Sequence, residues 1–251
     1  MIRILLVCAI ILFTGTSFSG TIDPNTPDQK YIEYGSKFPY VGLLIGKQND
    51  DTPFYGSVVA HTGNIVITAA HLFEDYKNGS VFINKKKIEI VKIITHKDFR
   101  SSIFGKNDIA VCLLKEDIGL DWYPDLYEKQ DEAGSLCSMS GFGSSGNFVT
   151  GVTSYKPIQR AGSNFIDSVN SHAMFCSPSI SYQKTELEFL IAPGDSGGGL
   201  FIGNKLAGIH SGLIENKTEK KKAKYGAVSA HTRVSVYNQW IKETIKNIKQ
   251  Q

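Results

Sequence analysis

The amino-acid sequence predicts an all-β protein built from two halves and closed by a helix at the carboxyl end. The first observation is a series of short segments rich in Val and Ile, each ended by Gly, Asn, Asp or Pro, which is typical of strands joined by turns. The second is a stretch over residues 115–134 where acidic and turn-forming residues interrupt that texture. The third is one long helical pattern over residues 236–248, in which apolar residues recur every three or four positions.

The expected elements divide the chain near residue 125. Strands expected in the first half cover residues 41–46, 55–60, 64–68, 80–83, 87–94 and 108–114. Strands expected in the second half cover residues 136–141, 148–153, 187–192, 199–202, 205–210 and 226–235. The two structural units are therefore expected at 21–125 and 126–251, with the terminal helix packing its apolar face on the second unit.

The start of the chain has the pattern of a secretory signal peptide. Arg3 precedes an almost unbroken apolar run over residues 4–13, and small residues follow it. Cleavage is expected after Ser19 or Gly20, so that residues 1–20 are removed. The apolar run is shorter than the roughly 20 residues that span a bilayer, so no membrane attachment is expected after cleavage. The protein is expected to be secreted or extracytoplasmic, and periplasmic if the organism is bacterial.

Composition limits the classes of partner and cofactor. Of the 251 residues, 41% are hydrophobic and 20% are charged, which is typical of a globular protein. A net charge of +3 is too small to indicate a nucleic-acid partner. Lysine-rich stretches at 85–87 and 217–224 are expected to be solvated loops, the alternative being attraction to anionic surfaces or substrates.

Three cysteines remain once the signal segment is removed. They are Cys112, Cys137 and Cys176, so at most one bridge can form within the chain. Because no CxxC pair is present, neither a metal nor a redox site is expected, and the thiols are interpreted as core residues or as one staple.

The strongest chemical signal is the run GDSGG at residues 194–198. A serine hydroxyl becomes a nucleophile only when a base removes its proton and donors stabilise the oxyanion that forms. Glycines allow backbone N–H groups to approach one small volume, so the N–H groups of Gly194 and Ser196 are the candidate oxyanion hole. The alternative is an ordinary turn, because the same residues are common in turns.

A base and a group to orient it are present upstream. His71 ends the segment TAAH directly after an apolar strand, and Asp108 opens another strand within NDIA. A carboxylate against one imidazole nitrogen leaves the other nitrogen free to take a proton. Separately, His71 would be an interior histidine and Asp108 a cap at the end of a strand.

The three segments TAAH, NDIA and GDSGG, in this order, resemble the signature segments of trypsin-like serine proteases. The resemblance covers most of residues 38–249. It implies two packed six-stranded antiparallel β-barrels with the active site between them, with Ser196 as nucleophile, His71 as general base and Asp108 as its orienting group. It also implies protein or peptide substrates and no cofactor, and leaves the oligomeric state open.

The chain departs from the family at its amino end and in its cysteines. Active members usually begin with Ile-Val-Gly-Gly, whose amino group pairs with the residue that is Asp195 here, and no such segment is present. The mature chain is expected to begin near Gly20 or Thr21 and to act without further trimming; a cut after Lys30 is the alternative. Leu72 stands where a cysteine is usual.

The resemblance also bears on substrate preference. It places Leu190 at the floor of the pocket that receives the residue before the scissile bond, which argues against Lys or Arg there. His210 and Ser211 fall on the pocket wall, His210 at the position where glutamate-specific relatives carry a histidine, with His231 behind it. An acidic residue would then be preferred; alternatively Leu190 and Ile191 form an apolar pocket for Phe, Leu or Tyr.

The main functional hypothesis is an endopeptidase. The alternative is a binding protein that keeps this fold without catalysis, since fold alone does not establish activity. A third hypothesis is the hydrolysis of small esters, which would use the same acyl chemistry.

Overall fold

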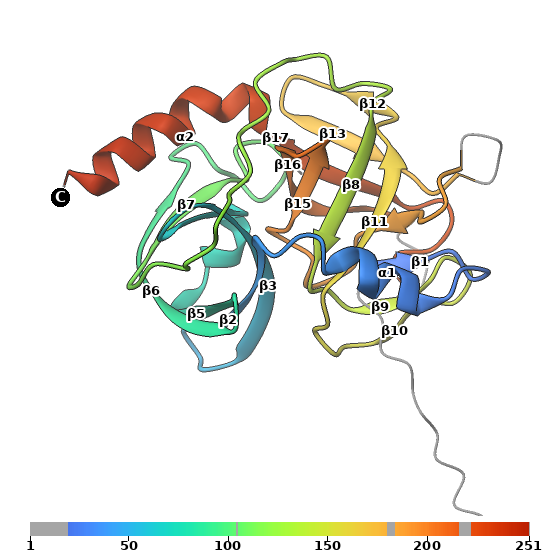
Figure 1. The fold of residues 1–251 in the computed structure, drawn as a ribbon, viewed down its shortest axis with the longest axis horizontal. Helices are drawn as coiled ribbons and strands as arrows, with labels where there is room; N and C mark the ends of the chain where they lie inside the picture. The colour runs from blue at the N-terminus through green and yellow to red at the C-terminus, as the bar shows by residue number, and fades with distance from the viewer. Residues whose placement is uncertain (1–19, 104, 180–183, 216–221, 251) are drawn as a thin grey trace, which may run out of the picture.

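The computed structural model describes residues 20–103, 105–179, 184–215 and 222–250. Residues 1–19 of the predicted signal segment lie outside these residues, and its last residue, Gly20, lies inside them. The chain forms two β units, and the terminal helix α2 (Val234–Lys249) lies over the first (Figure 1). No helix among the described residues is long and apolar enough to cross a membrane.

The first unit is a closed barrel of six antiparallel strands in the order β2-β3-β4-β7-β6-β5. Strand β4 is buried along its whole length, because the barrel core lies on one side of it and β16 of the second unit on the other. Val58, Ile67 and Val111 are among the fully buried side chains of this core. The six strands are β2 (Val41–Gln48), β3 (Pro53–Thr62), β4 (Ile65–Thr68), β5 (Tyr76–Ile83), β6 (Lys86–Thr95) and β7 (Ala110–Leu114).

The second unit consists of two sheets. A seven-stranded sheet has the order β11-β8-β15-β16-β17-β13-β12, and a four-stranded sheet has the order β10-β9-β1-β14. The predicted double-barrel fold is confirmed, but among the described residues only the strands of the first unit close into a barrel. In the second unit β1 lies between β9 and β14 in the smaller of two separate sheets. The strands are β8 (Leu136–Gly141), β9 (Ser145–Asn147), β10 (Gly151–Ser154), β11 (Arg160–Phe165), β12 (Ser168–Val169), β13 (Ala173–Cys176), β14 (Phe189–Leu190), β15 (Gly199–Ile202), β16 (Lys205–Ile214) and β17 (Val228–Arg233).

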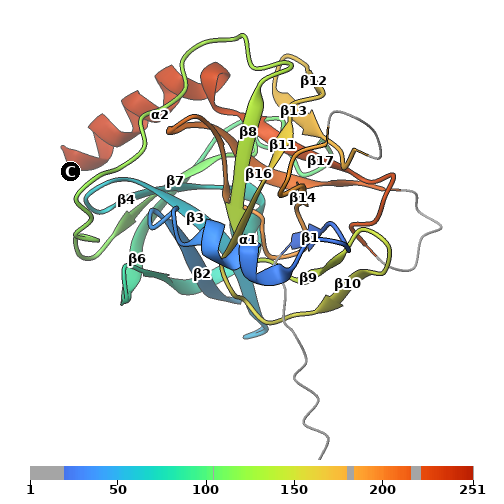
Figure 2. The same ribbon diagram turned by 45° about the vertical axis from the view of Figure 1, so that its right-hand side comes forward.

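The amino-terminal segment packs with the second unit, although the sequence groups it with the first. Strand β1 (Gly20–Ile22) pairs with β9 and β14, and helix α1 (Asp28–Gly35) lies against β11 (Figures 1 and 2). The buried Arg160 donates to both carboxylate oxygens of Asp28, at 2.6 and 2.8 Å. Burial lowers the pKa of Arg160, and the negative charges of Asp28 and Asp195 act in the opposite direction. The Arg160–Asp28 ion pair therefore fixes the position of α1 at the cost of desolvating both charges.

Residues 115–134 run from β7 of the first unit to β8 of the second. Near the predicted boundary, the Leu206 N–H donates to the Asp125 carbonyl, and the Tyr127 N–H donates to the Leu206 carbonyl, both at 2.8 Å.

Helix α2 does not pack on the second unit alone. It contacts β7 of the first unit as well as β16 of the second, with Ile241 and Ile248 buried. The Asn107 N–H donates to Tyr237 Oη at 2.8 Å, and the rings of His96 and Trp240 lie 5.1 Å apart. The helix therefore covers the junction of the units, because its apolar face is broad enough to contact both.

The three cysteines are buried free thiols in this structure. Burial raises the pKa of Cys112, and a hydrogen bond with Cys137 raises the pKa of Cys176. No group of three or more His, Cys, Asp or Glu side chains among the described residues is arranged to hold a metal ion.

Candidate active site

His71 lies in a short 3-10 turn, Ala70–Phe73, directly after β4. Ala69 and Ala70 are buried, and their small side chains let the turn pack closely while the imidazole stays 28% exposed. The His71 backbone N–H donates to Asp108 Oδ1 at 2.9 Å, and His71 Nδ1 lies 2.8 Å from Asp108 Oδ2. Because an ionised carboxylate only accepts hydrogen bonds, Nδ1 is the donor and Nε2 is left to accept a proton.

Asp108 is buried at the junction of the two units, just before β7. From the second unit, Ser211 Oγ donates to Asp108 Oδ2 at 2.5 Å and Thr232 Oγ1 donates to the Asp108 carbonyl at 2.8 Å. Burial alone would raise the pKa of Asp108, but the hydrogen bonds and charge of His71 and the bond from Ser211 outweigh it and hold this pKa below its usual value. Asp108 is therefore ionised at neutral pH, as a partner for an imidazolium must be.

Ser196 lies in the loop between β14 and β15, where it is held against the first unit. The Ser57 N–H donates to the Ser196 carbonyl at 2.7 Å, and the Gly197 N–H donates to the His210 carbonyl at 2.8 Å. Gly197 has φ +83°, and a Cβ there would fall 2.0 Å from Thr68 Oγ1, so only glycine fits. The backbone of the loop can therefore pass close to the His71 segment.

Leu72 occupies the position where members of the resembled family usually carry a cysteine. A Cβ on Gly56 would lie 2.9 Å from Leu72 Cδ1, and one on Gly197 would lie 3.1 Å from it. The Leu72 side chain therefore packs closely against β3 and against the loop that carries Ser196. Apolar packing thus joins the His71 turn to the nucleophile loop.

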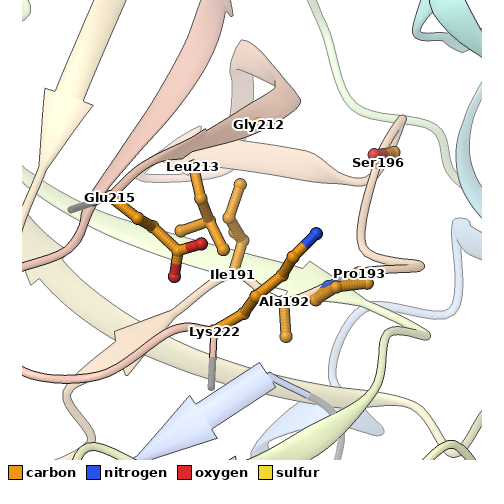
Figure 3. A pocket seen from close by; sticks show the side chains of 8 residues that line it. All are labelled: Ile191, Ala192, Pro193, Ser196, Gly212, Leu213, Glu215 and Lys222. Carbon is orange, nitrogen blue, oxygen red and sulfur yellow. The ribbon is translucent and has the colours of Figure 1, made fainter. Parts of the chain in front are cut away.

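The structure brings His71 and Asp108 into direct contact and sets Ser196 across the junction from them. Within the described residues no hydrogen bond joins Ser196 Oγ to the imidazole; such contacts commonly shorten when substrate binds. His71 and Asp108 line one cavity of about 250 Å³, and Ser196 lines a second of about 250 Å³ (Figure 3).

Two backbone donors next to the nucleophile are free. In the part of the chain that the structure describes, the N–H groups of Gly194 and Ser196 donate to no other group. Gly194 has φ +97°, a conformation that L side chains rarely adopt. The arrangement has what acyl transfer requires: a nucleophile, an oriented base and donors for an oxyanion.

Of the five residues predicted to bind the substrate side chain, only Ile191 lines the cavity beside Ser196. Leu190 is fully buried in a cluster with Phe148 behind the cavity wall. Ser211 instead holds Asp108.

His210 and His231 are fully buried and do not line the cavity. Their Nδ1 atoms lie 2.9 Å apart, and His231 Nε2 lies 2.9 Å from Ser229 Oγ. Burial lowers the pKa of His210 well below its usual value and that of His231 to about 3. Because burial disfavours the charged form of each ring, both rings are neutral at physiological pH. They therefore supply no positive charge to an acidic substrate.

The charged groups at this cavity are Lys222 and Glu215, which sequence reasoning did not single out. The lysine-rich stretch was visible in the sequence, but its pattern does not show which lysine faces a cavity. That depends on the course of the loop before β17.

A β-barrel unit that supplies a His–Asp pair, joined to a second β unit that supplies a serine flanked by free N–H donors, defines a double-barrel serine hydrolase. The trypsin family model matches residues 32–241, and the chain belongs to that family.

Solved structures share the fold at low sequence identity. The structure of HL collagenase has a TM-score of 0.67 and 18% identity, covering 91% of this chain and 98% of its own. Neuropsin, a serine protease expressed in the limbic system of mouse brain, has a TM-score of 0.64 and 19% identity, covering 83% and 95%. No curated protein matches the chain by sequence.

Replacing Ser211 with alanine is expected to destabilise the protein in a pH-dependent way. Asp108 has a lower pKa in the folded than in the unfolded protein, so its stabilisation is present above the unfolded carboxyl pKa of about 4 and is lost as the pH falls through the folded value. Ser211→Ala raises the folded pKa of Asp108. The free energy of unfolding should fall by about 2 kcal/mol at pH 7.

Below pH 4 this difference should shrink to the part due to the Gly105 N–H, which also binds Ser211 Oγ at 2.9 Å. Urea unfolding at several pH values measures it. Ser140→Ala is the control, because Ser140 Oγ donates to the Arg160 carbonyl, a neutral group. An equal and pH-independent loss in both variants would contradict the role assigned to Ser211.

Proposed function

We propose that the protein is a serine endopeptidase that hydrolyses peptide bonds through an acyl-enzyme intermediate. The observation that carries this proposal is the paired contact of His71 with Asp108, through the backbone N–H and through Nδ1. The two bonds fix the ring so that its basic nitrogen is available to the serine across the junction. Membership of the trypsin family supports the same reaction.

In this mechanism Ser196 Oγ attacks the carbonyl carbon of the scissile bond while His71 Nε2 accepts the hydroxyl proton. The developing oxyanion is stabilised by the Gly194 and Ser196 N–H groups. His71 then donates the proton to the leaving amine, and water attacks the acyl-enzyme by the reverse sequence. Asp108 stabilises the imidazolium formed in each half of the cycle.

The alternative, an inactive binding protein of the same fold, is less well supported. A buried carboxylate with hydrogen bonds from His71 and Ser211 is costly to maintain unless an ionised group is needed there. The free donors at Gly194 and Ser196 likewise serve the reaction rather than the fold.

Substitution of each triad residue tests the proposed reaction. We expect kcat on an unfolded protein substrate to fall by about 10⁴-fold or more in each of three variants. Ser196→Ala removes the nucleophile, His71→Ala removes the base, and Asp108→Asn leaves the imidazole in the wrong tautomer. His172→Ala, a histidine outside the site whose Nδ1 contacts Ser171, should behave as the wild type. Retention of a tenth of the turnover by Ser196→Ala would contradict the mechanism.

We propose further that the cavity beside Ser196 accepts an acidic or an apolar residue before the scissile bond. Its walls include Ile191, Ala192 and Leu213. Lys222 Nζ has no hydrogen bond or ion pair within the described residues, and in Figure 3 its side chain reaches across toward Pro193. The Glu215 carboxylate lies beyond Ile191 in that view and accepts the Ala223 N–H, which leaves Lys222 as the unpaired charge.

A peptide library profile separates the acidic from the apolar preference. If Lys222 recognises an acidic residue, Lys222→Met should reduce cleavage after Glu and Asp by about fivefold, the scale of one exposed charge pair. Glu215→Gln, at the same cavity, should leave cleavage after acidic residues unchanged or raise it. An acidic preference unaltered in Lys222→Met excludes this lysine as its cause, and dominant cleavage after Lys or Arg would contradict the proposal.

We propose that the protein acts outside the cytoplasm after removal of its first residues. The pairing of Thr21 with Leu190 and of Gly20 with Ser145 supports a mature chain that begins near Gly20. A mature chain beginning at Gly20 keeps all of β1 in the second unit. A chain beginning at Tyr31 would lose β1 and also Asp28, and would leave the buried Arg160 without that carboxylate.

Sequencing the amino end of active secreted material tests this account. The expected first residue is Gly20 or Thr21, with full activity and no further trimming. Active material that begins at Tyr31, together with an inactive longer form, would show instead that cleavage after Lys30 activates the enzyme.

A further inference from the structure

Residues 192–195 form a β-turn of one defined type. The Asp195 N–H donates to the Ala192 carbonyl at 2.9 Å, which closes the turn. Its second residue is Pro193, whose ring fixes φ near −65°, and its third is Gly194 with φ +97°. Negative φ followed by positive φ is the type II turn, and Pro–Gly is the pair that this type favours.

The peptide at the centre of this turn carries the Pro193 carbonyl and the Gly194 N–H on opposite sides. The Ser144 N–H donates to the Pro193 carbonyl at 2.6 Å. This bond directs the Gly194 N–H away from Ser144, where it meets no acceptor among the described residues. In a type I turn the same peptide would be rotated by about half a turn, and the carbonyl would replace the N–H beside Ser196.

Asp195 ties the donor Ser144 to the turn. Its carboxylate accepts the Gly143 N–H at 2.7 Å and the Ala192 N–H at 2.9 Å. One buried carboxylate therefore holds both the residue before Ser144 and the first residue of the turn. A Cβ on Gly143 would fall 2.4 Å from the Asp195 carboxylate, which shows how little space separates them.

The following peptide is fixed from the first unit. Ser57 Oγ donates to the Gly194 carbonyl at 3.0 Å and accepts the Phe142 N–H at 2.9 Å. The peptides on both sides of Gly194 therefore have partners that determine their orientation, while the Gly194 N–H itself stays free.

We propose that Pro193 is a positioning residue which, together with the Ser144 N–H, holds the Gly194 N–H toward the oxyanion before substrate binds. The inference rests on the proposed peptidase function. The proline ring fixes φ of Pro193 at a value that only type I and type II turns use, and the Ser144 N–H bond to the Pro193 carbonyl selects type II between these two. Less ordering of this donor then remains to be done during the reaction. Because the oxyanion is present only in the transition state and tetrahedral intermediates, the effect belongs to kcat rather than to KM.

The test compares Pro193→Gly with Pro157→Gly. Pro157 and Pro193 both line a further cavity, distinct from the one in Figure 3, but Pro157 lies outside the turn, which makes it a matched control. Steady-state kinetics on a cleaved peptide give kcat and KM, and a peptide boronate that forms a tetrahedral adduct with Ser196 measures transition-state binding. Pro193→Gly should lower kcat and boronate affinity by the same factor, about fivefold, with KM unchanged.

Gly194→Ala sets the scale for loss of the donor, because positive φ disfavours alanine; it should lower kcat by about 100-fold or more. Pro157→Gly should match the wild type in kcat. An unchanged kcat in Pro193→Gly, or a change confined to KM or to the melting temperature, would overturn the inference while leaving the peptidase function intact. A wild-type protein that cleaves no peptide and forms no boronate adduct would contradict the proposed function itself.

Discussion

The carboxylate of Asp108 is the interaction on which the arrangement of the site depends. It is buried between the two β units and accepts hydrogen bonds from His71 on one side and Ser211 on the other, while its carbonyl accepts a bond from Thr232. An ionised group in this position is stable only when both units supply donors. The same bonds therefore dock the units and orient the imidazole, so folding and catalytic geometry are coupled through one side chain.

A second buried carboxylate, Asp195, holds the backbone that carries the oxyanion donors of the proposed reaction. Its bonds to the N–H groups of Gly143 and Ala192 hold the segment that faces Pro193 and the turn that carries Gly194. In the proposed reaction the two carboxylates have different roles: Asp108 orients the base, and Asp195 supports the backbone around the oxyanion donors. Leu72 fills the space beside the nucleophile loop by apolar packing, so a covalent link is not needed to hold these segments together.

The residue patterns predicted two all-β halves and candidate residues for the site, and the family resemblance carried the prediction of the double-barrel fold. Alternating Val and Ile segments indicate strands wherever they pack, and GDSGG needs glycines for reasons that are visible along the chain. Specificity was harder to predict. His210 and His231 match a pattern of polar residues near the substrate, but the pleat of β16 and β17 turns both rings into the core. Lys222 reaches the cavity because of the path of a loop, which no local pattern encodes. The position of β1 was also missed, because three residues carry little strand signal and their partners are distant in sequence.

The most direct measurement of the central claim is covalent labelling with a fluorophosphonate, followed by mass analysis of the intact protein and of its fragments. A serine activated by the His71–Asp108 pair should form one adduct per chain, located on Ser196. His71→Ala should remove the adduct without unfolding the protein. An intact, folded wild-type protein that stays unlabelled at Ser196, or that is labelled equally fast in His71→Ala, would contradict the account.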